Sequence, residues 1–282
     1  MTTPAGPRAA AVHIGADVLA HPRHARWARP LSCRDTAERL WRVCQAAGIG
    51  VQQTLLGPDA TTGRARAAIA ASAAATGPGG VLVVTFSGHS ERPVPGEYGG
   101  GWCLHDQALR HGETAGLVAA APASAHIVII ADTCYAAACA AAFTGVPATT
   151  VVLAACAENQ ATLNYRQSQF VKTLERLTYP GGRPNPDCGS YAWLRRELRK
   201  DTPDVERPDI RASNPAAMRQ RPFQPTPQRS QASADGGEHR SAPDPPCSCC
   251  SQAGDRDVVN AETRKAGRAA RAGGEGTRRR GP

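Results

Sequence analysis

The sequence predicts an α/β fold in which a mostly parallel sheet is covered by helices on both faces. Apolar runs of strand length alternate with amphipathic or Ala-rich stretches of helix length as far as about residue 200. The run at residues 81–86 is apolar almost throughout, which is typical of a strand buried on both faces of a parallel sheet. With 282 residues, of which 41% are hydrophobic, the chain has enough apolar material for one large domain or two small ones.

The first half of the folded part contains three of the expected strands. Residues 10–15 form the first strand, and residues 35–47 form a helix with one apolar face. That face combines Ala37, Leu40, Trp41 and Cys44. A second strand at 51–56, an Ala-rich helix at 62–75 and the third strand at 81–86 follow, with a Gly-Pro-Gly-Gly turn at 77–80 before the last of them.

The second half continues the alternation. Residues 99–106 are a short extended excursion, and residues 113–121 are helical. The fourth and fifth strands lie at 126–131 and 149–155, and two helices close the folded part at 168–177 and 191–200. Because strands and helices alternate, the connections favour parallel neighbours.

The composition changes after residue 200. Residues 201–282 hold 10 of the 23 prolines, and beyond Phe223 the only large aliphatic residues are Val258 and Val259. Such a segment cannot bury enough apolar surface to offset its ordering entropy. We therefore predict a folded domain over residues 1–227, with its core at about 10–200, and a disordered Pro/Arg-rich basic tail at 228–282. Ile210, Met218 and Phe223 are the candidate anchors between residue 200 and the tail.

Charge and cysteine usage exclude several classes of protein. The net charge is +9, from 33 Lys+Arg against 24 Asp+Glu, and residues 264–282 alone carry seven Lys+Arg against one Glu. Because this basic stretch lies in the predicted disordered tail, we expect no nucleic-acid partner. No apolar run approaches the roughly 18 residues of a membrane span, and no signal peptide is visible. We expect a cytoplasmic chain with no membrane partner and ten reduced cysteines.

Candidate chemistry follows two neighbouring strands of the predicted sheet. The third strand leads into Ser87-Gly88-His89-Ser90, and the fourth into Asp132-Thr133-Cys134-Tyr135. Ligands gather at the carboxyl ends of parallel strands, so we expect His89 and Cys134 to lie side by side there. An imidazole beside a thiol is the basic unit of cysteine nucleophilic catalysis. A buried cysteine is more often a small hydrophobic residue, but here both residues follow the apolar runs instead of lying within them.

These two segments resemble the caspase-like cysteine peptidases of family C14, and most closely the metacaspase and bacterial orthocaspase branch. The motifs of that branch are aromatic-Ser-Gly-His-Gly and Asp-Ser-Cys-x-Ser-Gly. Further matches occur in the same order along residues 10–200: the strand at 12–15, the helix start at 33–37, the segment 102–106, and the strand and helix at 151–155 and 170–177. The resemblance implies a caspase-hemoglobinase-type three-layer α/β sandwich.

The resemblance also implies roles for single residues. Cys134 is the nucleophile, His89 is the acid/base, and the backbone amides of Gly88 and Cys134 hold the oxyanion. Asp132, Ser87 and Asp35 line the specificity pocket, and two carboxylates in one recess would bind an Arg or Lys side chain by charge-assisted hydrogen bonds. Asp35 could instead be a helix N-cap, and Asp132 an acceptor that stabilises its loop; either structural role is compatible with the functional one.

The chain departs from the family pattern at three positions. Ser90 replaces the glycine after the histidine, and Ala136-Ala137 replace the Ser-Gly after the cysteine. These changes restrict the loops without removing a nucleophile, a base or a charge.

The expected function is that of a cysteine endopeptidase that cleaves protein or peptide substrates after Arg or Lys through an acyl-enzyme. The alternative is a catalytically weak or inactive caspase-like scaffold that recruits partners through its tail; another Cys-His hydrolase on a similar sheet is a further possibility. We expect a monomer. Residues 135–165 contain no Arg, Lys or Asp, so we also expect an uncut catalytic domain. Any self-cleavage is expected in mobile backbone beyond residue 200, near Arg207, Arg219, Arg221 or Arg229.

No metal or cofactor is expected from the sequence. His105-Asp106 is more typical of a structural pair, and Cys247-Ser248-Cys249-Cys250 lacks a second cysteine pair, with only His239 nearby. Calcium dependence stays open, because the aspartates of the metacaspase calcium site have no clear counterparts.

Overall fold

One six-stranded sheet, in the order β2-β1-β3-β6-β7-β8, forms the centre of the fold. In this computed structural model the described residues are 8–25, 31–93, 100–162, 168–202 and 206–224. They belong to the first of two units, residues 1–230, and the second unit, 231–282, lies outside them. The strands are β1 (Ala10–Ala16), β2 (Val51–Leu56), β3 (Val81–Gly88), β6 (His126–Asp132), β7 (Thr149–Ala154) and β8 (Asp209–Ala212).

The first five strands are parallel, and β8 is antiparallel to β7. The helices are α1 (Pro22–Ala25), α2 (Cys33–Ala46), α3 (Thr62–Ala75), α4 (His111–Val118), α5 (Gln169–Thr178) and α6 (Tyr191–Lys200). Short 3-10 helices are η1 (Gly57–Asp59), η2 (Ala136–Phe143), η3 (Pro180–Gly182) and η4 (Pro215–Arg219).

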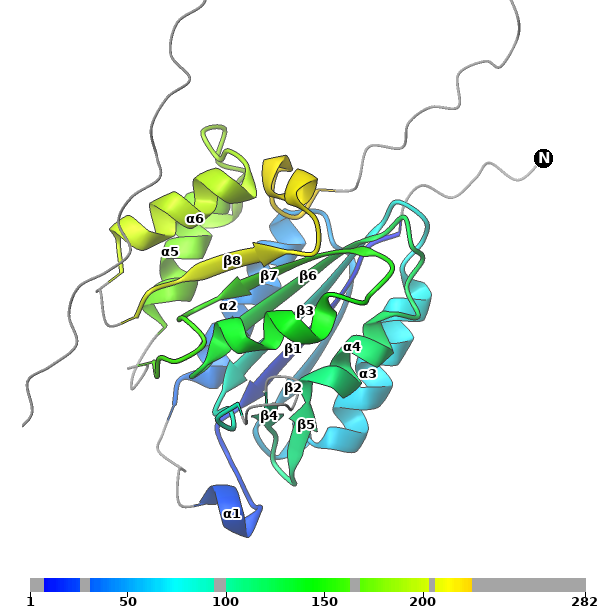
Figure 1. The fold of residues 1–282 in the computed structure, drawn as a ribbon, viewed down its shortest axis with the longest axis vertical. Coiled ribbons are helices and arrows are strands. Elements are labelled where there is room, and N and C mark those ends of the chain that lie inside the picture. The colour runs from blue at the N-terminus through cyan, green and yellow to red at the C-terminus, as the bar shows by residue number, and fades with distance from the viewer. Residues whose placement is uncertain (1–7, 26–30, 94–99, 163–167, 203–205, 225–282) are drawn as a thin grey trace, which may run out of the picture. The chain divides into compact units, whose positions relative to one another are not determined.

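Helices cover both faces of the sheet. Residues of α3, α4 and η2 pack into one apolar cluster, and residues of α2, α5 and α6 pack into a second cluster on the opposite face. In Figure 1, α3 lies beside α4, and α5 lies with α6 near β8. This arrangement confirms the predicted fold class, a mostly parallel three-layer α/β sandwich.

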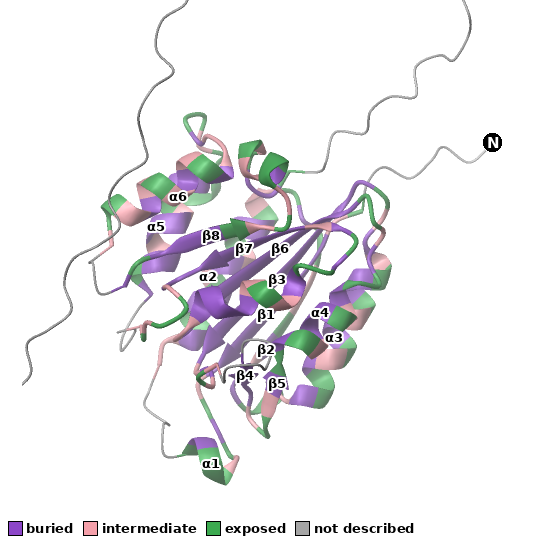
Figure 2. Cartoon of the chain, in the orientation of Figure 1, coloured by how far each residue is buried: buried purple, intermediate pink, exposed green. Residues whose placement is uncertain are grey.

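Alternation along β3 shows how the two clusters share the sheet. Leu82, Val84 and Phe86 belong to the α3/α4 cluster, whereas Val81 and Val83 belong to the α2/α5 cluster. All eight residues of β3 are buried. Figure 2 shows the central strands buried and the outer surfaces of the helices exposed. The apolar run of β3 is therefore explained by burial on both faces.

The structure corrects the predicted start and face of the first long helix. It begins at Cys33, with Ser32 in the N-cap position, so Asp35 lies in the first turn and is not the cap. Val43 is buried on the inner face, whereas Trp41 is only half-buried. Helical periodicity accounts for the difference, because the buried positions 33, 36, 37, 40, 43 and 44 form one stripe and residue 41 lies at its edge.

A hairpin accounts for the extended excursion after the third strand. β4 (Gly101–Cys103) and β5 (Ala108–Arg110) pair antiparallel as a separate two-stranded sheet. Gly99, the first residue of the predicted excursion, lies outside the described residues.

The segment after residue 200 contributes a strand that the sequence pattern did not reveal. Ile210 of β8 and Phe223 are buried, and Met218 is half-buried, so all three predicted anchors contact the domain. Arg207 and Arg221 are hydrogen-bonded to it, through the Arg207 N–H and the Arg221 guanidinium. Our expectation of mobile backbone around Arg207, Arg219 and Arg221 is thus wrong, because β8 and η4 order this segment; Arg229 lies outside the described residues. No helix within the described ranges is long and apolar enough to cross a membrane.

Candidate active site

The predicted dyad residues follow two adjacent strands that pair in register. β3 and β6 are neighbours, and their last paired residues are Ser87 and Asp132. His89 and Cys134 each lie two residues beyond this pair, at the carboxyl edge of the sheet, and both are half-buried. The strand order therefore brings these two segments to one place.

Cys103 of β4 lies close to both predicted catalytic residues. Its N–H donates to the backbone oxygen of His89 over 2.9 Å. Burial raises the pKa of the Cys103 thiol to about 12, and the nearby Glu91 and Cys134 act in the same direction. Ser90 fixes the same loop, because its hydroxyl donates to the Gly101 oxygen at 3.1 Å. The serine at the glycine position of the family motif thus ties the histidine loop to β4.

The loop that carries Cys134 has an unusual backbone and several fixed contacts. Tyr135 has a φ of 56°, in the left-handed region that non-glycine residues seldom adopt. The Tyr135 N–H donates to the Gln160 oxygen at 2.7 Å, which holds this conformation. The Cys134 sulfur lies 3.8 Å from the Thr162 hydroxyl oxygen. Sequence reasoning assigned no role to the 156–162 loop, which holds the cysteine loop from the far side.

Cys156 completes the contact between these two loops. Its thiol lies 3.3 Å from the Thr133 oxygen and 3.2 Å from the Gln160 oxygen, as donor. Burial raises its pKa to about 12, so the thiol stays protonated and available as a donor. Its backbone oxygen accepts from the Ala137 N–H at 3.1 Å. Ala136 and Ala137, which stand where the motif of the resembled family has Ser-Gly, are buried in η2.

Asp132 is a buried carboxylate with a serine hydroxyl on each oxygen. It is 3% exposed, Ser87 donates to Oδ2 at 3.0 Å, and Ser168 donates to Oδ1 at 2.8 Å. Cys33, the first residue of α2, lies against the same group. Burial is the main cause of its raised pKa; a hydrogen bond with Ser87 opposes this effect, and the charges of Asp132 and Asp17 reinforce it.

The structure does not bring Asp35 into this group. Asp35 is exposed in the first turn of α2, and it forms no hydrogen bond or ion pair with the described residues. Cys33 occupies the position beside Ser87 and Asp132 instead. Sequence analysis missed Cys33 and Ser168 as neighbours of Asp132. For Ser168, a detectable signal existed, since a serine directly before an apolar helix is a typical N-cap.

Gly88 has a packing reason to be glycine. A Cβ on this residue would lie 3.0 Å from the Ala16 oxygen and 2.8 Å from the Phe86 ring. The close approach at this position is therefore to β1 and to the core, whether or not the amide also contacts an oxyanion.

His105 and Asp106 are structural within the described part of the chain. Both carboxylate oxygens of Asp106 accept from Thr62, one from its N–H and one from its hydroxyl, each at 2.8 Å. The His105 ring is 3.0 Å from the Val18 oxygen. Across the described ranges no cluster of His, Cys, Asp or Glu has the composition of a metal site; Cys247, Cys249, Cys250 and His239 lie outside these ranges.

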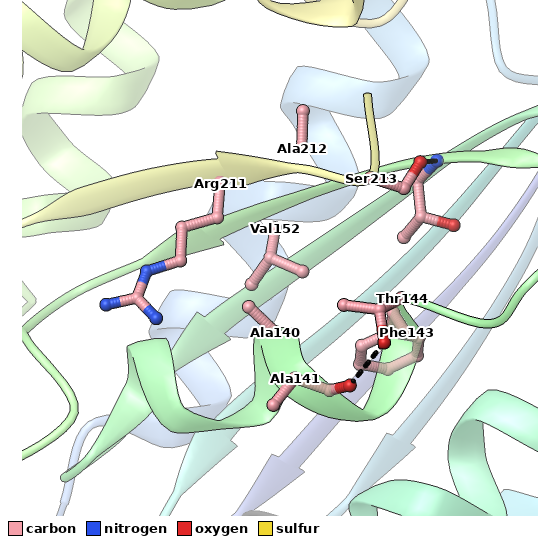
Figure 3. Close-up of a pocket in the computed structure, with 9 residues that line it drawn as sticks. Ala140, Ala141, Phe143, Thr144, Val152, Arg211, Ala212 and Ser213 are labelled. Carbon is pink, nitrogen blue, oxygen red and sulfur yellow. Dashed lines mark hydrogen bonds between the residues drawn. The ribbon is translucent and has the colours of Figure 1, made fainter. Parts of the chain in front are cut away.

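A separate pocket of about 310 Å³ lies between η2, β7 and β8 (Figure 3). Its walls are mainly apolar, with Phe143 and Val152 among the lining residues and Arg211 at one side. Arg211 is paired with Asp209 and Glu158. None of the predicted site residues lines this pocket, so it is distinct from the carboxyl edge that holds His89 and Cys134.

Comparisons with known proteins support the fold but assign no family. No family model matches the chain, and no curated protein matches it. Among solved structures, protein GSU0716 from Geobacter sulfurreducens is similar over 78% of this chain and 99% of its own, with 22% identity and a TM-score of 0.63. Caspase-1 from Spodoptera frugiperda matches over 75% of this chain and 91% of its own, with 13% identity and a TM-score of 0.47. The first of these similarities, with GSU0716, concerns the fold alone.

Proposed function

We propose that this protein is a cysteine endopeptidase that cleaves after Arg or Lys. The observation that carries the proposal is the pairing of Ser87 with Asp132 at the ends of β3 and β6. This pairing sets His89 and Cys134 at one edge, above a buried carboxylate. A thiol, an imidazole and an acidic recess are the parts that cleavage after a basic residue requires.

The proposed reaction uses only groups of this chain, the peptide and water. The Cys134 sulfur attacks the carbonyl carbon, and its proton passes to His89. Backbone amides of Gly88 and Cys134 donate to the oxyanion that forms. When the C–N bond breaks, His89 gives the proton to the leaving amine, and an acyl-enzyme remains. Water, deprotonated by His89, then attacks the thioester and releases the acid, which restores the thiol.

Asp132 is the proposed binding residue for the basic side chain of the substrate. Each oxygen of a carboxylate can accept more than one hydrogen bond, so the serine contacts do not preclude a further bond from a guanidinium or an ammonium. We propose Asp132 and Ser87 as the groups that bind it. Asp35 is proposed as a more distant charge, because it is exposed on α2.

An active-site probe with a P1 arginine and a thiol-reactive warhead tests the proposed function. We expect labelling of the wild type at Cys134, and neither labelling nor hydrolysis of Arg substrates in the Cys134→Ala variant. His89→Ala should remain folded and lose at least about a hundredfold in kcat/KM. A wild-type chain that neither reacts with the probe nor cleaves a basic peptide library would favour the inactive scaffold.

A further inference from the structure

We infer that Ser168 is a positioning residue for substrate specificity, through its hydrogen bond to Asp132. The inference rests on the proposed function and names a residue that the sequence motifs do not include. The Ser168 hydroxyl donates to Asp132 Oδ1 at 2.8 Å. Ser168 and Asp132 are only 4% and 3% exposed, so water contributes little to solvating this carboxylate.

A buried carboxylate needs hydrogen-bond donors to stay ionised. Without them, burial favours the protonated form and weakens attraction to a cation. The Ser87 hydroxyl donates to Oδ2 and the Ser168 hydroxyl donates to Oδ1, so both oxygens of the carboxylate are hydrogen-bonded. Losing the Ser168 hydroxyl would leave Oδ1 with one donor fewer and the carboxylate less firmly oriented.

The direction of the Ser168 hydroxyl proton is fixed by α5. Ser168 caps this helix, and its oxygen accepts from the Val171 N–H at 3.0 Å. Because that oxygen is already an acceptor, its single proton is directed to Asp132. Phe170, Val171 and Leu174 are buried against the sheet, so the start of α5 is a rigid support. The positive end of the helix dipole further favours a negative charge here.

The effect on catalysis should appear in the binding of the basic side chain. Asp132 would contact the substrate cation, whereas Ser168 acts through Asp132. Loss of the Ser168 hydroxyl should therefore raise KM for Arg substrates and leave kcat nearly unchanged. Substrates with citrulline, which matches the shape of arginine without its charge, should be affected much less.

The experiment compares Ser168→Ala with a matched cap variant, Ser190→Ala. Ser190 caps α6 in the same way, accepting from the Trp193 N–H at 3.3 Å, but no described contact joins it to Asp132. We expect Ser168→Ala to lower the Arg-over-citrulline ratio of kcat/KM by about tenfold, the size of one hydrogen bond to a charged group. Ser190→Ala should keep the wild-type ratio, and Ser168→Thr should restore most of it.

A variant that keeps the N-cap of α5 separates the loss of the hydroxyl donor from destabilisation of the helix. Ser168→Asp supplies an N-cap acceptor for α5 but has no proton to donate, and its charge opposes that of Asp132. We expect it to lose the preference for Arg at least as strongly as Ser168→Ala, with the acidic limb of the pH profile moved to higher pH. An unchanged Arg-over-citrulline ratio in an active Ser168→Ala or Ser168→Asp enzyme overturns the inference alone. A wild type without activity on Arg substrates overturns the proposed function and the inference together.

Discussion

At the scale of single residues, Asp132 and Asp35 differ in how much their charges can contribute. Asp132 is buried between two serine hydroxyls, whereas Asp35 is surrounded by solvent. A charge–charge interaction is strong where water is excluded and weak where it is not. Specificity should therefore depend on the first residue far more than on the second.

Paired Asp→Asn variants test this difference. Asp132→Asn should lower kcat/KM for Arg substrates by about 10- to 100-fold, corresponding to roughly 1–3 kcal/mol of transition-state binding. Asp35→Asn, which removes an exposed charge, should change it by no more than about twofold. Steady-state kinetics on matched Arg peptides measures both. Equal losses in the two variants would show that Asp35 reaches the pocket in solution.

At the scale of elements, the contact between β1 and α2 sets the position of Cys33. A Cβ on Gly15 would lie 2.7 Å from the Cys33 oxygen, which is backbone and cannot move away cheaply. This glycine lets the start of α2 come close to the end of β1 and so brings Cys33 near Ser87 and Asp132.

Two Gly→Ala substitutions separate this packing requirement from helix propensity. Gly15→Ala should lower the free energy of unfolding by about 1–3 kcal/mol, because β1 and α2 must separate. Gly116→Ala, in α4 with no atom within 4 Å of the added Cβ, should raise it by about 0.5–1 kcal/mol. Urea unfolding followed by circular dichroism gives both values. Stabilisation by Gly15→Ala would contradict the close approach.

The sequence predicted the bounds of some elements correctly and missed one strand. The bounds of β2, α3 and α6 agree with prediction. In α3 and α6 the signals are local, an alanine run in the first and a strong amphipathic stripe in the second. β8 was missed because its four residues, Asp209–Ala212, contain a single large apolar side chain. It is a strand because β7 offers it an open edge, and that information is not local.

In the candidate site, the positions of the two dyad residues could be predicted from the sequence, but the contacts between its loops could not. His89 and Cys134 follow apolar runs, so strand order alone places them at one edge. The contacts of Ser168 with Asp132 and of Cys156 with Thr133 join segments that are distant in sequence, and only the packed loops reveal them. Asp35 failed as a neighbour of Asp132 because a helix that begins two residues earlier turns Cys33 inward and Asp35 outward.

At the scale of the whole molecule, two buried histidines make stability depend on pH. Burial lowers the pKa values of His13 and His126 to about 4, from an ordinary value of 6.5. Between pH 6.5 and 4 the unfolded chain binds protons at these positions that the folded chain does not. The free energy of unfolding should thus fall as the pH drops below 6.5, by on the order of 2–3 kcal/mol for each histidine.

Denaturant unfolding at a series of pH values between 7.5 and 4.5 measures this dependence. His126→Gln should reduce the slope, since glutamine can still bond to the Tyr191 hydroxyl, which lies 3.0 Å from His126 Nε2, without titrating. His105→Gln is the control, because that residue is only half-buried. A wild-type stability that is flat across this range would contradict the burial of neutral histidines.

The catalytic unit should also act as one uncut chain. Residues 135–165 contain no Arg, Lys or Asp, and within this stretch Ala136–Phe143 form η2 and Thr149–Ala154 form β7. An enzyme specific for basic residues has no preferred site there. Intact-mass analysis of the active wild type, with Cys134→Ala as the control for other proteases, should show no fragments divided between 135 and 165. Such fragments, appearing together with activity, would contradict this prediction.

The antiparallel position of β8 has a consequence for how the protein is made. β7 is completed at Ala154, yet its partner strand begins only at Asp209, so a growing chain carries an unsatisfied sheet edge while the intervening residues are synthesised. Open edges of this kind pair readily with other chains. Chains that end at Lys200 should therefore self-associate. Chains that extend beyond Phe223, which follows β8 and is buried, can instead pair β8 with β7 within one molecule.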